Sequence, residues 1–153
     1  MSVVIRNAEV KDITSIVKLV HELADFEKMS ESCLLTDEKL NVLLFEEHSL
    51  HSLVAEKDGE IIGIMLFYFF KVSTFTGKKV MYVEDVYIVP QERGNGIGTL
   101  FFEKARTIAK ERNCSRLEWK CLAWNEKAVS FYNKIGAESD DEWITFTINS
   151  ENF

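Results

Sequence analysis

Apolar residues recur along this chain at two kinds of spacing. Helical spacing predicts helices, and short apolar or alternating runs predict strands. Near the start, a short apolar run at residues 3–6 predicts a strand. Apolar residues at helical spacing then follow Asp12, an expected N-cap, and predict a helix that ends near Met29. Thr36 is expected to cap a second, shorter helix.

The pattern in the middle of the chain predicts a run of strands. Residues 53–56 and 61–70 are largely apolar and flank an Asp-Gly pair at 58–59, which is typical of a tight hairpin turn. A long strand is predicted over 80–89. Pro90 ends it, because proline cannot donate to a strand ladder.

Helices and strands alternate in the last third of the chain. A glycine-rich stretch opens an amphipathic helix that is expected to end near Asn113, and a strand is predicted at 116–122. Asn125 can cap a further helix that Gly136 ends, and alternating residues at 143–148 predict a last strand. Strand–helix–strand units bring strands into parallel pairing, so we expect an α/β fold with a mixed sheet.

Composition limits the size and class of the protein. The chain has 153 residues, 46% of them hydrophobic, with one proline and seven glycines. Such a chain can bury one core and contains no linker composition, so we expect a single domain over 1–153. We expect no signal peptide, and the longest apolar run, 61–70, is too short to cross a bilayer as a helix. The expected location is the cytoplasm, with no membrane partner.

Charge and cysteine content limit the partners. The formal net charge of −7 argues against nucleic acid, which proteins bind mainly through lysine and arginine. Ordinary solubility explains the charge first, and attraction of a cationic ligand is the second interpretation. Cys33, Cys114 and Cys121 lack the spacing of a metal site and are expected to be free thiols. We expect no metal.

The stretch over 83–99 carries the strongest chemical signal. An apolar strand runs into a loop with glycines at Gly94, Gly96 and Gly98, and a helix begins there. The backbone N–H groups of such a loop, added to the positive end of a helix, form a cradle for a pyrophosphate, and Arg93 places a cation beside it. A Rossmann site would carry its glycines after the first strand, with an acidic residue about 20 residues later. The order of elements here does not match that pattern.

A second block runs over 124–137. It begins with Trp124-Asn125, carries Tyr132 late in a predicted helix, and ends with a Gly-Ala pair at Gly136. Phe131 is expected to pack this helix on the sheet, whereas Tyr132 is a functional candidate.

Both blocks resemble the signatures of the GNAT N-acetyltransferases. The pattern Arg93-x-x-Gly96-x-Gly98 is similar to the loop that binds the acetyl-CoA pyrophosphate in this family, and the helix with Tyr132 is similar to the second signature. Over nearly the whole chain, the sequence resembles the spermidine/spermine (diamine) and thialysine acetyltransferases. The other segments that carry this resemblance are Ile5-Arg6-x-Ala8, Glu22-Leu23-Ala24-x-Phe26-Glu27-Lys28, Leu53-Val54-Ala55-Glu56 and Tyr82-Val83-Glu84-Asp85-Val86-Tyr87-Ile88. The chain departs from the family at Ala123, where an acidic residue is usual.

The resemblance implies a fold and a role for individual residues. The implied fold is the GNAT fold, with a mixed central sheet of about six to seven strands flanked by about four helices. Tyr132 would be the general acid, and Glu84 would orient or deprotonate the amine. The residues implied to bind acetyl-CoA are Val86, Tyr87, Ile88, Arg93, Gly94, Asn95, Gly96, Ile97, Gly98, Thr99, Asn125, Glu126, Lys127 and Ala128. The residues implied to form the substrate wall are Phe26, Glu27, Glu84, Asp85, Glu118, Trp119 and Lys120.

The implied activity is transfer of an acetyl group from acetyl-CoA to a primary amine of a small cation, which is a diamine, a polyamine or a thialysine-like amino acid. A homodimer is implied as well. Two alternatives stay open. One is acetylation of another amino acid, or of a protein lysine or N-terminus. The other is a non-catalytic acyl-CoA-binding module, against which the presence of both Tyr132 and Glu84 argues.

Overall fold

The computed structural model describes residues 2–153, which form two compact units, Met1–Lys120 and Cys121–Phe153. In the first unit the strands and longer helices are β1 (Val4–Asn7), α1 (Ile13–Phe26), α2 (Asp37–Asn41), β2 (His51–Lys57), β3 (Glu60–Ser73), β4 (Lys78–Ile88), α3 (Ile97–Glu111) and β5 (Arg116–Trp119). The second unit contains α4 (Glu126–Lys134). Short helical turns are η1 (Val10–Asp12), η2 (Ser30–Ser32), η3 (Val42–Glu46), η4 (Pro90–Glu92) and η5 (Ser150–Asn152). The expected single domain over 1–153 remains a prediction.

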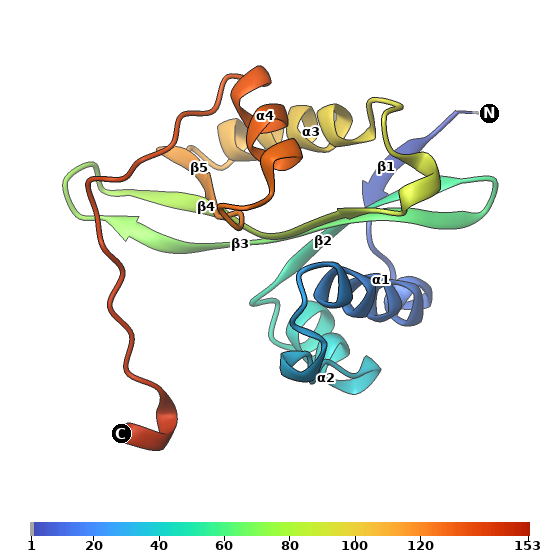
Figure 1. Ribbon diagram of the computed structural model, residues 1–153, viewed down its shortest axis with the longest axis horizontal. Helices are drawn as coiled ribbons and strands as arrows, with labels where there is room; N and C mark the ends of the chain where they lie inside the picture. Colours follow the sequence, from blue (N-terminus) through green and yellow to red (C-terminus); the bar gives the residue numbers. More distant parts are fainter. Residues whose placement is uncertain (1) are drawn as a thin grey trace. The chain divides into compact units, whose positions relative to one another are not determined.

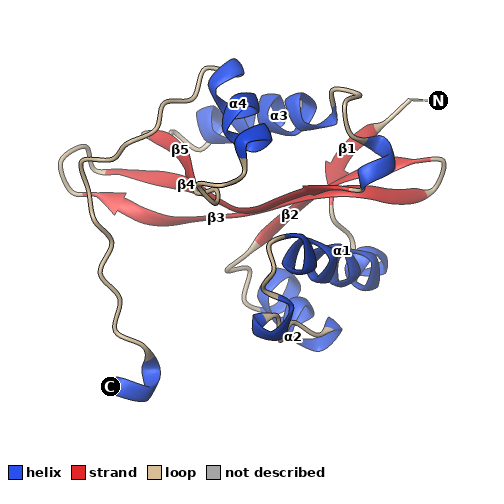
Figure 2. Cartoon of the chain, in the orientation of Figure 1, coloured by secondary structure: helices blue, strands red, loops and turns tan. Residues whose placement is uncertain are grey.

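The first unit is built around a five-stranded sheet in the order β1-β2-β3-β4-β5. Neighbouring strands are antiparallel except β4 and β5, which are parallel. The predicted α/β class and mixed sheet are therefore confirmed. Helices α1 and α2 lie on one face of this sheet, and α3 lies on the opposite face (Figures 1 and 2).

Each face of the sheet has its own apolar core. On the α1 side, Ile16 and Leu40 are fully buried against the strand residues Val54 and Ile64. On the other side, α3 buries a set of residues that includes Phe101 and Phe102. A Cβ at Gly63 would lie 3.2 Å from the Phe101 ring and from the carbonyl oxygen of Tyr87, so this close approach of α3 to β3 favours glycine. Both faces of the central strands are thus covered, which fixes the register of β3 against β4.

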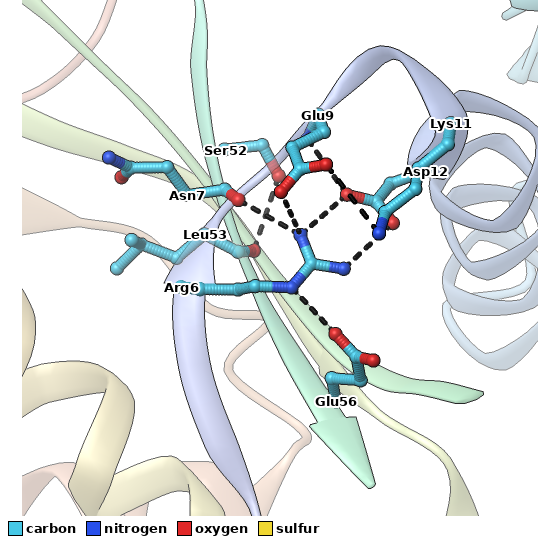
Figure 3. Close-up of polar contacts among 8 residues, drawn as sticks. All are labelled: Arg6, Asn7, Glu9, Lys11, Asp12, Ser52, Leu53 and Glu56. Carbon is cyan, nitrogen blue, oxygen red and sulfur yellow. Dashed lines mark hydrogen bonds and ion pairs between the residues drawn. The ribbon is translucent and has the colours of Figure 1, made fainter. Parts of the chain in front are cut away.

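An ionic network joins β1 to the start of α1 (Figure 3). The guanidinium of Arg6 donates to both oxygens of Asp12, at 2.7 and 3.0 Å, and to Glu56 on β2 at 2.6 Å. The backbone N–H of Glu9 also donates to Asp12. The pKa of Asp12 is lowered below its usual value, and the hydrogen bond from Arg6 is the largest cause of this shift. Asp12 does stand at the N-cap position, but it bonds to Arg6 and Glu9 and makes no side-chain cap.

Two predicted boundaries and one predicted strand differ from the structure. Helix α1 ends at Phe26 instead of near Met29, because Lys28 adopts a left-handed conformation with φ of 61°. Strand β5 ends at Trp119 instead of residue 122, at the residue where its ladder with β4 ends. The last predicted strand, 143–148, does not form: Trp143, Ile144 and Phe146 are 82%, 79% and 91% exposed in an irregular segment. Alternation supplies a pattern for a strand but not the partner that a strand needs.

The other sequence signals agree with the structure. The turn at 58–59 and the strand that ends before Pro90 are confirmed. Thr36 caps α2 by accepting from the N–H of Lys39. In the second unit, Asn125 caps α4 by accepting from the N–H of Ala128, and Gly136 follows the helix with φ of 92°. No disulfide joins Cys33, Cys114 and Cys121 to one another, as expected.

Candidate active site

A bulge in β4 brings two neighbouring carboxylates to one face of the sheet. The ladder with β3 shifts register beside Leu66, which lies opposite Asp85, and Glu84 is the extra residue. Neighbouring strand residues normally point to opposite faces. Here Asp85 shares the face of Leu66, which packs in the core with α1. Glu84 reaches the same face, because its Oε2 accepts a hydrogen bond of 2.9 Å from the hydroxyl of Tyr68, two residues beyond Leu66.

A third carboxylate joins these two at the end of α1. Glu27 is the C-cap residue of that helix, and we call Glu27, Glu84 and Asp85 the acidic cluster. Burial raises the pKa of Asp85 to about 7, and the charges of Glu84 and Glu27 add to this effect. Burial also raises the pKa of Glu27. Because the charges of Glu84 and Glu27 oppose the ionisation of Asp85, a bound cation would relieve the repulsion among the three carboxylates.

Aromatic rings lie beside the acidic cluster. The rings of Tyr68, Phe70 and Tyr82, which we call the aromatic cluster, have centroids 5.1 to 6.1 Å apart. Burial, with a contribution from Glu84, raises the pKa of Tyr68, so its phenol stays protonated. The sequence analysis did not select Tyr68. Its contact depends on the bulge at Glu84, for which the sequence carries no signal.

The second half of β4 has an open edge. Parallel pairing with β5 covers only Val80 to Val83, and among the described residues no strand pairs with 84–88 on that side. The N–H of Val89, just after β4, donates to the carbonyl of Ile62 in β3, at 3.0 Å. Because backbone groups alternate along a strand, those of Val86 and Ile88 point away from β3, toward the open edge. A ligand with an extended amide chain can pair there as an added strand would.

The glycine loop follows directly after this edge. Gly94 and Gly96 both have φ of 81°, a left-handed conformation that favours glycine, and Gly96 is the N-cap of α3. Ahead of the loop, Lys57 on β2 holds Glu92 of η4 at 2.9 and 3.0 Å. Asn95 donates its side-chain amide to the carbonyl of Glu92. Residues 94–99 therefore form a tethered turn at the positive end of a long helix, which suits a phosphate group.

Arg93 connects the loop to the sheet face that carries the acidic cluster. Its Nε donates to the carbonyl of Ile88 at 2.8 Å. Its guanidinium carbon lies 5.4 Å from the centre of the Phe26 ring and 5.2 Å from that of Tyr87. Arg93 thus contacts Phe26, a residue expected in the substrate wall, and the strand expected to bind the cofactor. A contact between Arg93 and a phosphate remains a prediction.

The remaining residues expected in the substrate wall lie on β5 and just after it. Glu118 lies opposite Tyr82 and accepts from Arg116 at 3.0 and 3.1 Å. Trp119 lies with its ring centroid 4.8 Å from that of Phe102 on α3. Successive strand residues point to opposite faces, so of these two only Glu118 shares the face of Tyr82. Lys120 is exposed.

The second signature lies in the unit Cys121–Phe153. Tyr132 is half-buried on α4, and its ring centroid is 5.6 Å from that of Phe131. Glu126, Lys127 and Ala128 form the first turn of this helix after the Asn125 cap. The carbonyl of Tyr132 accepts from Ala137, just past the helix end. The helix forms as the sequence predicted, and the role of Tyr132 remains a prediction.

Two further features of the described residues bear on the chemistry. No three His, Cys, Asp or Glu side chains within residues 2–153 are grouped so that they could hold a metal ion. In the same part of the chain, no helix combines the length and the apolar character that a membrane crossing needs.

A family model matches the part of the chain that contains these residues. Residues 16–137 match the model of the acetyltransferase (GNAT) family. This range includes the acidic cluster, the open edge, the glycine loop and α4.

Curated relatives match over most of the chain. A thialysine N-epsilon-acetyltransferase of Mus musculus is 38% identical, and the alignment covers 96% of this chain and 92% of that protein. An enzyme of the same name from Caenorhabditis elegans is 32% identical, over 94% of this chain and 93% of that one. A spermidine/spermine N(1)-acetyltransferase-like protein of Homo sapiens is 31% identical, over 96% of this chain but 22% of the longer human protein.

Solved structures share the fold. An integron cassette protein from the mobile metagenome of V. cholerae superposes with a TM-score of 0.82 and 24% identity, over 99% of this chain and 95% of that one. An aminoglycoside acetyltransferase from an uncultured soil sample gives a TM-score of 0.80 at 16% identity, over 96% and 95%. At such identities the likeness concerns the fold alone.

Proposed function

Because this chain belongs to the GNAT acetyltransferase family, we propose that it transfers the acetyl group of acetyl-CoA to a primary amine of a small cation, a diamine, a polyamine or a thialysine-like amino acid. That it is an acetyltransferase acting on an amine follows from the family model and the curated relatives. The choice of a small cation is our inference from the site.

The observation that carries this choice is the acidic cluster on β4 and α1. Glu84 and Asp85 share one face because of the bulge, and Glu27 adds a third carboxylate. Primary amines have a pKa of about 10 and arrive protonated at neutral pH. Three carboxylates in one place attract an ammonium ion and suit a substrate with a second positive charge.

The cofactor would lie along the open edge. GNAT acetyltransferases use acetyl-CoA. In our proposal, the backbone of Val86 and Ile88 pairs with the pantetheine arm, and the loop of residues 94–99 receives the pyrophosphate. Tyr87 and Arg93 would complete this part of the binding site, and the family resemblance implies that Asn125 and the first turn of α4 also bind the cofactor. This arrangement is supported by the left-handed glycines and by the edge of β4 beyond Val83, which no strand among the described residues covers.

The proposed reaction needs a proton acceptor and a proton donor. Glu84 would accept a proton from the ammonium ion, directly or through water, so that the neutral amine can attack the thioester. The backbone N–H of Val86, which points to the open edge, would stabilise the oxyanion that forms. Tyr132 would then protonate the leaving thiolate of coenzyme A.

Two further proposals concern the state of the protein. We propose a homodimer and a cytoplasmic location, as the family resemblance implies. Light scattering on the purified protein gives a mass near twice 17.7 kDa if the dimer forms, and a mass near 17.7 kDa if the chain is monomeric.

An acetyl-CoA consumption assay over a panel of amines tests the proposed substrate. The panel contains thialysine, lysine, putrescine, spermidine, a neutral monoamine and lysine-containing peptides. We expect turnover with a dication-like amine and little with the monoamine. Turnover that is highest with peptides, or equal with the neutral monoamine, would contradict the small-cation proposal.

Tyr132→Phe tests the proton donor. The variant keeps the ring and removes the hydroxyl. General acid catalysis typically contributes about 10²–10⁴-fold, so we expect kcat to fall by a factor in that range. Binding of acetyl-CoA, measured by calorimetry, should be unchanged. A variant that turns over at the parent rate would show that Tyr132 only packs and that another group, such as water, donates the proton.

A further inference from the structure

The hydroxyl of Tyr68 makes a direct contact with the proposed proton acceptor. It donates to Oε2 of Glu84 over 2.9 Å. Tyr68 stands on β3 opposite Tyr82, in the antiparallel ladder that also carries the bulge at Glu84. Donor and acceptor are therefore held by the same pair of strands.

The ring of Tyr68 is itself held in place. Its centroid lies 5.1 Å from that of Phe70 and 5.4 Å from that of Tyr82. A phenol between two neighbouring rings has few orientations, whereas an exposed glutamate such as Glu84 has many rotamers. The hydrogen bond from this fixed ring therefore restricts the orientations of the Glu84 carboxylate.

We propose that Tyr68 is a positioning residue of the acetyl transfer, whose hydroxyl fixes the carboxylate of Glu84 in the orientation that receives the proton of the substrate ammonium. This inference rests on the proposed role of Glu84. In this step the N–H bond of the ammonium breaks, an O–H bond forms on Glu84, and the phenol keeps its own proton. Burial beside Glu84 raises the pKa of Tyr68, which keeps the phenol a donor at every working pH.

Tyr68→Phe tests this role, with Tyr82→Phe as the matched control. Both variants remove one hydroxyl from the aromatic cluster. Among the described residues, however, no hydrogen bond joins Tyr82 to Glu84. The assay uses the fastest amine of the panel above at saturating acetyl-CoA. We expect kcat to fall about tenfold or more in Tyr68→Phe, because a hydrogen bond to a charged group is lost. The KM for acetyl-CoA should not change, and Tyr82→Phe should stay within about twofold of the parent.

A double-mutant cycle with Glu84→Gln separates positioning from packing. If Tyr68 acts through Glu84, adding Tyr68→Phe to Glu84→Gln should lower kcat by less than about twofold. Losses that multiply across the cycle would overturn the inference. So would a parent-like kcat for Tyr68→Phe, or equal losses in Tyr68→Phe and Tyr82→Phe.

The same cycle tells the two proposals apart. If Glu84→Gln is impaired and Tyr68→Phe is not, the inference on Tyr68 fails and the proposed role of Glu84 stands. If Glu84→Gln itself turns over at the parent rate, the role of Glu84 fails and the inference fails with it.

Discussion

Both halves of β4 pair with β3 on one side, but only the first half pairs with β5 on the other side. Residues 80–83 pair with β3 and with β5, and Val80 and Met81 are fully buried. Residues 84–88 keep their pairing with β3 but have no strand on the other side among the described residues. One strand thus supplies a core element and, directly after it, backbone groups that a ligand can use.

The boundary between the halves coincides with the bulge at Glu84. The extra residue bends the strand, and β5 ends opposite Val83. Because β3 runs unbroken beside both halves, the second half remains fixed although one edge is open. A site can thus be built on a rigid strand at the point where its regular pairing stops.

Glu84→Gln is expected to have the largest effect on the second half. Loss of the proton acceptor should lower kcat/KM for the amine by about 10²–10⁴-fold at pH 7, a range typical of general base catalysis. Activity should recover as the pH rises, because more of the substrate then arrives as the neutral amine. Steady-state kinetics across pH 6 to 10 measure this effect.

The matched control for this variant is Glu103→Gln, which removes an exposed carboxylate from α3. It should keep parent kinetics. A Glu84→Gln variant with the rate and pH profile of the parent would show that the second half of β4 does not supply the base.

Met81→Ala tests the first half. Met81 is fully buried, and truncating such a side chain costs about 2–5 kcal/mol of the free energy of unfolding. Denaturant unfolding measures this loss. The KM values of the protein that remains folded should equal those of the parent. If KM for acetyl-CoA rose severalfold while stability held, the division of β4 into a core half and a site half would be wrong.

Asp85→Asn is expected to change the stability less than Met81→Ala does. It should raise the free energy of unfolding instead of lowering it. In the folded protein burial raises the pKa of Asp85 to about 7, above its usual 3.8. Well below pH 3.8 both states are protonated, and the group does not affect folding. As the pH rises toward 7 the unfolded state loses its proton first, so the parent loses stability. The amide removes this loss, so Asp85→Asn should be more stable by about 2 kcal/mol at pH 8, after allowance for partial exposure, and nearly unchanged at about pH 3, below the unfolded-state pKa.

Denaturant unfolding of Asp85→Asn and of the parent at both pH values checks the sign. A variant that is less stable than the parent at pH 8 would mean that the carboxylate makes favourable contacts as an ion. Burial of the acidic cluster would then not lower the free energy of unfolding.

The sequence predicted much of the fold because its signals were local. The glycines at 94 and 96 need left-handed φ, Asn125 offers its side chain to a helix start, and an Asp-Gly pair turns a hairpin at 58–59. Each of these signals acts over a few residues, so no distant partner is needed to recognise it.

The parts that the sequence did not predict depend on partners far along the chain. The register shift beside Leu66 places Glu84 and Asp85 on one face, and only the pairing of β3 with β4 decides it. The same shift brings Tyr68 to Glu84. The segment 143–148 has the alternation of a strand and no strand structure, because alternation does not specify the strand with which it would pair.

Amide NMR of the protein during a titration with coenzyme A tests the central claim that the second half of β4 receives the cofactor. The account predicts large shift changes and slower hydrogen exchange at the amides of Val86 and Ile88, and at residues 94–99 of the loop. The amides of residues 80–83, which already pair on both sides, should change little. Saturation with coenzyme A that leaves Val86 and Ile88 unchanged, while other amides shift, would contradict the account.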